Sequence, residues 1–390
     1  MISVSQARAA LFDLVKPLPA EEIDLIDAAG RVLAREVFAQ RDQPPFAASS
    51  MDGYAVKSAE VELHAMFKVV GEAAAGHRFD GPVGAGQAVR IFTGAPVPEG
   101  TDFVVIQEDV SRSGDLITIT DDPGGKSNIR PAGGDFTRGT PVSAPRVLAP
   151  QDIALLASMN IARVPVTRKP VIAILATGDE LVMPGETPGP DQIIASNSFG
   201  LKAMVEQLGA TARLLPIARD SLSSLRMAFE LATGADLIVT IGGASVGDHD
   251  LVAQAAADLG MERSFYKVAM RPGKPLMAGR LNGAAMVGLP GNPVSAMVCG
   301  HIFLVPMVRA MLGLGSDLPP LRQARLDAPL TRNGPREHYM RAIVSDGQVN
   351  AFDNQDSSLL TILSQANALL VRAPDDPAQK AGAMVNYLPL

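Results

Sequence analysis

Apolar runs and helical periodicity alternate along the middle of the chain. Residues 171–175, 211–217 and 237–239 are aliphatic or β-branched runs typical of buried strands. Between them, two stretches repeat apolar residues at helical spacing, one starting at Asn197 as a predicted N-cap and ending at Gly209, the other running from Leu222 to Gly234. This βαβαβα order predicts a parallel sheet with helices on its faces.

The flanking parts of the chain have a different texture. Residues 3–15 predict an amphipathic helix, and residues 21–37 predict a short strand at 23–26 followed by a helical stretch around 31–35. Short β-branched runs at 67–70, 88–92, 103–107 and 116–120, separated by Gly and Pro, predict a small all-β domain. Residues 136–168 predict a return to helical structure with Ile153, Leu156 and Ala157 on one face, and runs at 340–344 and 368–371 predict strands near the C-terminus.

These patterns predict a multidomain α/β plus β protein. We expect an elongated framework domain split between residues 1–45 and 135–168, and a β-rich domain over 46–134. A doubly wound, mostly parallel sheet domain is expected over 169–315, and a β-barrel-like domain over 316–390. The apolar helix expected from Pro293 to about Leu312 contains Ser295, His301 and Arg309, which favours a buried helix over a membrane span.

Composition narrows the function classes. The 390 residues are 47% hydrophobic and 19% charged, as in globular proteins, and the net charge of −7 argues against broad nucleic-acid affinity. The single Cys299 excludes an internal disulfide and a cysteine metal cluster, and it suits a reducing cytoplasm. The N-terminus shows no basic segment followed by a long apolar core, so we expect no secretory signal.

A glycine-rich loop follows the predicted strand at 237–239. Gly242, Gly243 and Gly247 leave backbone N–H groups free to approach an oxyanion at a helix N-terminus. Asp248 and Asp250 would repel a bare anion, so they indicate Mg²⁺ between carboxylate and phosphate; capping of the helix by Asp250 is an equal alternative.

Other strand ends in a doubly wound sheet would face the same crevice. They carry Thr177-Gly178-Asp179-Glu180, Asp220, Arg271-Pro272-Gly273-Lys274-Pro275, and Leu289-Pro290-Gly291-Asn292-Pro293-Val294-Ser295. Carboxylates beside cations and backbone donors suit Mg²⁺ together with an oxyanion. Each motif alone is ambiguous, since the first can be a surface turn and the arginine-lysine turn a solvated loop.

Two loops of the β-rich region carry further polar motifs. Asp52 lies in Ser50-Met51-Asp52-Gly53-Tyr54-Ala55-Val56, and Thr93 begins Thr93-Gly94-Ala95-Pro96-Val97-Pro98. A simple Asp-Gly turn explains Asp52 at least as well as chemistry does.

Taken in order, these motifs resemble the molybdopterin molybdenumtransferase family, which is related to the E domain of gephyrin. The resemblance spans essentially the whole chain. It implies a transferase that inserts molybdate into adenylylated molybdopterin and releases AMP, assisted by Mg²⁺. It also implies roles residue by residue: Asp52, Thr93, Asp135, Glu180, Asp220 and Asp250 as catalytic pocket residues, and Glu180, Asp248 and Asp250 near the metal.

The same resemblance implies the residues that hold substrate. These are Gly242, Gly243, Ser245, Gly247, Arg271, Lys274, Pro290, Pro293, Ser295 and Arg336. Molybdate is a tetrahedral dianion, so lysine, arginine, hydroxyl and N–H donors suit it.

The resemblance further implies a homodimer whose active site lies at the subunit interface, with Asp52 and Thr93 acting across it. A molybdopterin adenylyltransferase is an expected partner. We expect no binding to nucleic acids or to membranes. Two positions depart from the family pattern: Ala47-Ala48 removes polar groups near Asp52, and Arg271 replaces a lysine.

Three other functions are compatible with parts of the pattern. A molybdopterin adenylyltransferase would share the glycine-rich domain but would not need Asp52 and Thr93. A non-catalytic pterin-binding scaffold would not need the paired acids. Zinc-dependent hydrolysis is disfavoured because the five histidines are not spaced as metal ligands. We interpret His249 as a solvated side chain, or as one that contacts metal ligands without binding the metal itself.

Overall fold

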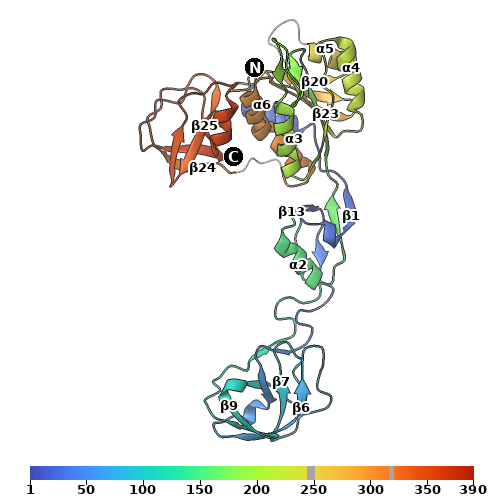
Figure 1. Cartoon of the computed structure of the whole chain (residues 1–390), viewed down its shortest axis with the longest axis vertical. Coiled ribbons are helices and arrows are strands. Elements are labelled where there is room, and N and C mark those ends of the chain that lie inside the picture. The colour runs from blue at the N-terminus through green and yellow to red at the C-terminus, as the bar shows by residue number, and fades with distance from the viewer. Residues whose placement is uncertain (244–250, 316–319) are drawn as a thin grey trace. The chain divides into compact units, whose positions relative to one another are not determined.

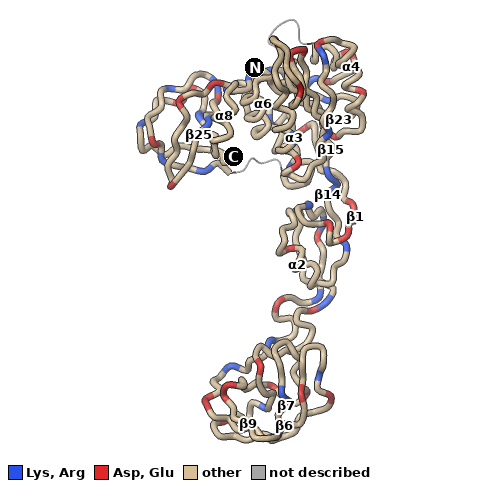
Figure 2. Tube along the Cα trace, in the orientation of Figure 1, with Lys and Arg blue, Asp and Glu red and all other residues tan. Residues whose placement is uncertain are grey.

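The computed structural model describes residues 1–243, 251–315 and 320–390. The chain forms two compact units, each assembled from separate segments. One unit contains Met1–Glu21, Gly30–Ala34 and Val166–Leu390, and the other contains Glu22–Ala29 and Arg35–Pro165. Figure 2 shows acidic and basic residues interspersed in both units. The four domain boundaries expected from the sequence stay predictions.

A six-stranded sheet forms the centre of the first unit, in the order β18-β15-β19-β23-β22-β20. Its strands are β15 (Val171–Ala176), β18 (Thr211–Leu214), β19 (Leu237–Ile241), β20 (Glu262–Tyr266), β22 (Met277–Leu281) and β23 (Ala284–Leu289). The first four strands in this order are parallel, and the last two are antiparallel to their neighbours. This confirms the predicted doubly wound, mostly parallel fold.

Helices cover both faces of this sheet because its strands are apolar on both sides. Ile172 and Ile174 of β15 face one core, with α3 (Asn197–Gln207), α6 (Pro293–Cys299), the π-helix η4 (Gly300–Leu304) and α7 (Val305–Met311). Ala173 and Leu175 face another core, with α4 (Leu222–Leu231) and α5 (Leu251–Asp258). Figure 1 shows α4 and α5 together on one side of the sheet and α3 and α6 on the other.

The N-terminal helix α1 (Val4–Phe12) packs into the first of these cores. Val4, Ala7 and Leu11 are buried there beside Phe303 and Met311. Ser3 caps this helix by accepting from the Gln6 N–H, and the Gln6 side chain accepts from the Ser3 N–H in return. The predicted helix at 3–15 is therefore present and anchored by its apolar face.

The apolar run after Asn292 is a core element of the first unit. Among the described residues, Pro293–Met311 is one helix that is long and apolar enough to cross a membrane, but 72% of its most apolar window is buried inside the protein. Asn292 is its N-cap and Pro293 its first residue, as the sequence predicted. Cys299 is fully buried in it, and burial raises the pKa of its thiol.

The C-terminal strands close into a barrel. The order β21-β25-β26-β24-β28-β27 is completed by pairing of β25 with β27. The strands are β21 (Met270–Arg271), β24 (Arg322–Leu326), β25 (Glu337–Ser345), β26 (Gln348–Ala351), β27 (Ala368–Arg372) and β28 (Met384–Pro389), with α8 (Leu360–Gln365) beside them. β21 joins the edge at β25, so the turn after it belongs to this barrel as well as to the central domain.

The second unit is built on a six-stranded sheet in the order β8-β5-β7-β6-β10-β9. Its strands are β5 (Gly53–Val56), β6 (Met66–Ala73), β7 (Gln87–Ile91), β8 (Phe103–Ile106), β9 (Val110–Ser113) and β10 (Leu116–Ile119). The alternating side chains form two cores, one around Phe67 and Ile117 and one around Val89 and Ile91. Four of the predicted strands are confirmed here.

Shorter elements complete the fold. They are β1 (Ala20–Asp24), η1 (Leu25–Asp27), β2 (Val32–Leu33), β3 (Val37–Phe38), β4 (Ala48–Ser49), η2 (Ser58–Glu60), η3 (Gln107–Asp109), β11 (Ile129–Arg130), β12 (Pro141–Val142), β13 (Arg146–Val147), α2 (Pro150–Ser158), β14 (Arg163–Thr167), β16 (Leu181–Val182) and β17 (Ile193–Ile194).

Three local predictions were wrong. The stretch around 31–35 is not helical: Val32 and Leu33 form β2 in the sheet β1-β14-β2-β13, and both are buried there. In 136–168 only α2 is an α-helix, and the surrounding residues form strands. Asn197 is the first residue of α3 rather than its N-cap, which is Ser196.

Candidate functional site

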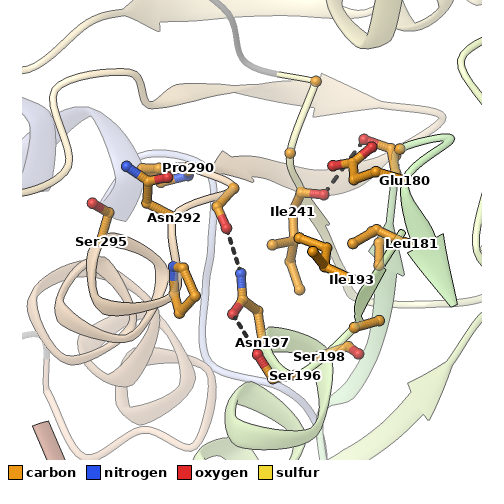
Figure 3. Close-up of a pocket in the computed structure, with 18 of the residues that line it drawn as sticks. Glu180, Leu181, Ile193, Ser196, Asn197, Ser198, Ile241, Pro290, Asn292 and Ser295 are labelled. Carbon is orange, nitrogen blue, oxygen red and sulfur yellow. Dashed lines mark hydrogen bonds between the residues drawn. The ribbon is translucent and has the colours of Figure 1, made fainter. Parts of the chain in front are cut away.

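The main cavity lies at the carboxyl ends of three parallel strands. Thr177 and Gly178 follow β15, Gly242 and Gly243 follow β19, and the Pro290 turn follows β23; all line one cavity of about 910 Å³. Figure 3 shows its labelled side chains converging from these elements and from the start of α3. This is the location where open α/β sheets bind ligands.

Two predicted carboxylates line this cavity, namely Glu180 and Asp220. The neighbouring residue Asp179 forms hydrogen bonds within the protein instead. Its carboxylate accepts from the Asp220 N–H at 3.1 Å, and its carbonyl accepts from the Arg219 guanidinium at 2.8 Å. Asp179 therefore joins the two strand-end turns and leaves Glu180 and Asp220 beside the cavity.

The glycine turn after β19 approaches its neighbours too closely for a side chain. Gly242 has φ +88°, and a Cβ there would lie 2.7 Å from the Thr177 carbonyl oxygen. Gly243 has φ +66°, and a Cβ there would lie 2.2 Å from Cγ2 of Val252. Both positions need glycine for backbone conformation and for space.

The opposite wall of the cavity carries uncharged polar groups. The Asn197 amide donates to the Gly291 carbonyl at 2.7 Å, and its oxygen accepts from Ser196 at 3.3 Å (Figure 3). Ser295 is 4% exposed and lines the same wall, together with Asn292. The amide of Asn292 donates to the Ser357 hydroxyl at 2.9 Å, which links this turn to the barrel.

Apolar side chains complete the cavity. Leu181, Ile193 and Ile194 line it from the two-stranded ribbon of β16 and β17 (Figure 3 labels the first two). Ile193 is 58% exposed. The cavity thus combines an apolar wall, a polar wall and two carboxylates, which suits a ligand with a flat heterocycle and an anionic group.

Arg271 lies at a second cavity, of about 460 Å³, on the barrel side of β21. There it is the direct neighbour of His338 on β25, and His338 is the neighbour of Arg372 on β27. Arg336 donates to the Met270 carbonyl at 3.3 Å close to this cavity. Lys274 is exposed in the turn between β21 and β22, and Pro275 after it lines the main cavity.

In the second unit, Asp52 and Thr93 form one constellation. A single Asp52 carboxylate oxygen accepts from the Thr93 N–H at 2.7 Å and from the Thr93 hydroxyl at 2.8 Å. These two bonds, with the nearby Arg90 guanidinium, lower the pKa of the Asp52 carboxyl below its usual value. Asp135 is an exposed residue elsewhere in this unit. Its backbone N–H donates to the Gln43 carbonyl.

The structure therefore brings together one part of the predicted set. Glu180, Asp220, Gly242, Gly243, Pro290, Pro293 and Ser295 share the main cavity. Ser245, Gly247, Asp248 and Asp250 lie outside the described residues, as does His249. Among the described residues no group of three or more His, Cys, Asp or Glu side chains is placed to hold a metal ion.

Sequence reasoning missed several cavity residues. Asn197 was interpreted as a helix cap, whereas its amide faces the Gly291 turn. Ser196, Ser198 and Ser358 also line the main cavity, and His338 and Arg372 line the second. The run of polar residues at 196–198, directly after the short apolar run at 193–195, is the sequence pattern that could have indicated the residues of the main cavity.

Known families match the chain in three consecutive segments. The MoeA N-terminal region (domain I and II) matches residues 2–160, the Probable molybdopterin binding domain matches residues 173–310, and the MoeA C-terminal region (domain IV) matches residues 323–390.

Full-length relatives agree with these matches. A Haemophilus influenzae protein named molybdopterin molybdenumtransferase is 34% identical over 100% of this chain and 98% of its own length. A protein of the same name from Nostoc is 35% identical over 95% of this chain and 90% of its own. The crystal structure of a molybdopterin biosynthesis MoeA protein from Pyrococcus horikoshii superposes with a TM-score of 0.84 at 25% identity, covering 100% of both chains. From its three matched segments, its full-length relatives and its fold, this chain belongs to the molybdopterin molybdenumtransferase family of transferases in molybdenum cofactor biosynthesis.

Proposed function

We propose that this protein inserts molybdate into adenylylated molybdopterin and releases AMP, with the main cavity as the substrate site. The supporting observation is the cavity itself, which places Glu180 and Asp220 beside the glycine turn of Gly242 and Gly243 at the ends of parallel strands. Backbone N–H groups at such a turn suit a phosphate. The apolar ribbon of β16 and β17 suits the flat pterin.

Individual roles follow from chemistry and from the family resemblance. Arg271, Lys274, Ser295 and Arg336 would hold molybdate or substrate phosphate, because oxyanions bind to guanidinium, ammonium and hydroxyl donors. Ser245 and Gly247 are proposed for the same ligand.

Mg²⁺ fits the carboxylates of this cavity. Protein-bound Mg²⁺ is commonly held by one or two carboxylates together with substrate phosphate oxygens and water, and Glu180 and Asp220 supply two within the described residues. Asp248 and Asp250 are the other proposed holders. When bound, Mg²⁺ would offset the charge that grows on the departing phosphate. The protein's own contribution is to orient the phosphoanhydride against the glycine turn and to shield it from water.

Release of AMP tests the function directly. Purified protein supplied with adenylylated molybdopterin, Mg²⁺ and molybdate is expected to release AMP, and omission of molybdate should abolish the release. Glu180→Gln should lower turnover by at least a hundredfold, because it removes a charge at the cavity. Glu230→Gln, which changes an exposed glutamate on α4, is the matched control and should leave turnover unchanged.

The same assay separates the two alternatives. Tight pterin binding without AMP release would indicate a scaffold, and product made from ATP and free molybdopterin would indicate an adenylyltransferase. Full-length similarity to proteins named molybdenumtransferases favours metal insertion over the adenylyltransferase function.

We also propose a cytoplasmic homodimer in which Asp52 and Thr93 of one subunit complete the site of the other, with Asp135 contributing from the same unit. Mixed dimers test this arrangement. Asp52→Asn and Glu180→Gln should each inactivate the homodimer of that variant. When the two variants are refolded together, half of the randomly paired dimers are mixed, and each mixed dimer has one of its two sites built from wild-type residues only. The mixture should therefore regain roughly a quarter of wild-type activity. Absence of recovery in verified mixed dimers would contradict sharing of the site. A molybdopterin adenylyltransferase is the proposed supplier of substrate.

A further inference from the structure

A row of three basic side chains crosses the barrel at the second cavity. Arg271 of β21, His338 of β25 and Arg372 of β27 are direct neighbours in the strand registers. Residues directly opposite on adjacent strands point to the same face of a sheet. All three line the cavity of about 460 Å³.

His338 is buried in this row without a partner for one ring nitrogen. The residue is 7% exposed, and no described group forms a hydrogen bond with its Nε2 atom. A buried polar atom without a partner has lost its hydrogen bonds to water and gained none in return. Folding therefore leaves a donor or acceptor in the cavity wall that a ligand can satisfy.

Four arginines act on this imidazole. Burial, followed by the positive charges of Arg271, Arg372, Arg341 and Arg336, lowers the pKa of His338 to about 4. Arg341 is 1% exposed, and its guanidinium donates to the Asp356 and Asn354 carbonyls and the Gln355 side chain rather than to a carboxylate.

The acidic groups nearby are already engaged or lie at the rim. Asp376 pairs with the Arg372 guanidinium. Asp356 accepts from the Ser358 N–H at 2.8 Å and from its hydroxyl at 2.6 Å. Glu337 accepts from the Tyr339 hydroxyl at 2.6 Å. Asp353 is exposed where it lines the cavity, and Arg332 on the same rim lies 3.8 Å from Asp375.

We propose that this second cavity is a proton-coupled oxyanion site, in which a small tetrahedral dianion binds beside Arg271 and Arg372 while His338 takes up one proton from solvent. The dianion would place its negative charge beside these two guanidinium groups. The protonated Nε2 would then donate to an anion oxygen and so gain the partner it lacks in the free protein.

The direction of the pH dependence follows from linkage. Free His338 is neutral at pH 7, since its pKa is about 4. A bound dianion favours the charged imidazolium and raises that pKa. Between the free and the bound pKa, binding takes up a proton, so affinity should increase by up to about tenfold for each unit that the pH falls.

This inference rests on the proposed function in one respect, because Arg271 is also proposed to hold molybdate or substrate phosphate. Its new content is the participation of His338 and Arg372 and the linked proton. Direct binding measurements test it without reference to turnover.

Calorimetry of the full-length protein is the primary experiment. Sulfate, which remains a dianion throughout, is titrated at pH 5.5 and 7.5 in pairs of buffers with different ionisation enthalpies, which gives the number of protons bound. We expect tighter binding at pH 5.5 and uptake approaching one proton. Molybdate and phosphate at pH 7.5 identify the source: tighter binding of molybdate indicates the substrate oxyanion, and tighter binding of phosphate indicates a phosphate group.

Two variants locate the proton. His338→Gln should abolish proton uptake and flatten the pH dependence of affinity. His301→Gln is the matched control, since His301 is a histidine of η4 whose pKa burial also lowers to about 4, and it should leave both unchanged. Nitrogen NMR of labelled wild-type histidines gives the same answer without a variant, because anion binding should protonate one imidazole.

No binding at millimolar anion, or binding without proton uptake, would overturn the inference. Equal proton uptake by wild type and a folded His338→Gln protein would do the same. If the wild-type protein releases AMP normally in either case, the proposed function stands.

Discussion

The close approach of Gly242 to Thr177 predicts a stability difference between two glycine substitutions. Gly242→Ala places a methyl group 2.7 Å from a backbone carbonyl oxygen in a residue with φ +88°. Gly234→Ala is the matched control, because Gly234 has φ +79° but nothing within 4 Å of the added Cβ. Both variants carry the cost of a left-handed alanine, about 1–2 kcal/mol.

Gly242→Ala also carries a cost that the control does not. A carbonyl oxygen belongs to the backbone, so it moves only with β15 and the turn after it, and forced repacking of this kind costs about 1–3 kcal/mol. We therefore expect the free energy of unfolding to fall by about 1–3 kcal/mol more in Gly242→Ala than in Gly234→Ala.

Urea denaturation followed by circular dichroism measures this difference, and the AMP-release assay measures its functional counterpart. Turnover should fall strongly in Gly242→Ala and little in Gly234→Ala, since only the first residue lines the main cavity. Equal losses of stability in the two variants would refute the idea that close packing against Thr177 fixes the cavity turn.

Four further results are expected. Thr93→Val should raise the pKa of Asp52 toward its ordinary value, measured by NMR titration; because the native pKa is lowered, the stabilisation it reflects is present at neutral pH and is lost as the pH falls through the acid range. Asn197→Ala should lower the free energy of unfolding by about 1 kcal/mol in urea denaturation, through loss of the bond to the Gly291 carbonyl. Arg341→Met should lower it by about 3 kcal/mol in the same assay, because buried carbonyl acceptors lose their donor. Removal of Mg²⁺ with a chelator should stop AMP release, and added Mg²⁺ should restore it.

Each of these results has an outcome that would contradict it. An unchanged Asp52 pKa in Thr93→Val would mean that the hydrogen bond from the Thr93 hydroxyl does not stabilise the carboxylate. Unchanged unfolding of Asn197→Ala or Arg341→Met would mean that water replaces the lost donor at no cost. Full turnover in excess chelator would exclude a divalent cation from the reaction.

Periodic segments were predictable from the sequence because their local preferences agree with their burial. The strand at 171–175 and the helix from Pro293 are examples, since each is apolar on the faces that the core covers. The pair Val32 and Leu33 shows the opposite case. Good helix formers surround it, but pairing with β14 and full burial determine its conformation.

Strands β22 and β23 were missed because alanine, glycine and methionine dominate them. Such residues have low strand propensity, and tertiary pairing supplies what the local sequence does not indicate.

The candidate site was predictable only where one sheet controls it. The rule that parallel strand ends share a crevice places Glu180, Asp220 and Gly242 in one cavity. Arg271 lies at the other cavity, because β21 pairs with β25 of the barrel rather than with the central sheet. The two paired strands are separated by about seventy residues of sequence, so a local sequence pattern does not predict their pairing.

The burial of α1 has a consequence for synthesis of the protein. Its apolar face is covered by Phe303 and Met311, and Leu18 after it donates to the Met311 carbonyl. A ribosome adds about 5–20 residues per second, so α1 stays uncovered for roughly 15–60 s before the residues that cover it are made. All residues of the second unit, the last of which is Pro165, are synthesised within that interval, while the apolar face of α1 still lacks the side chains that cover it.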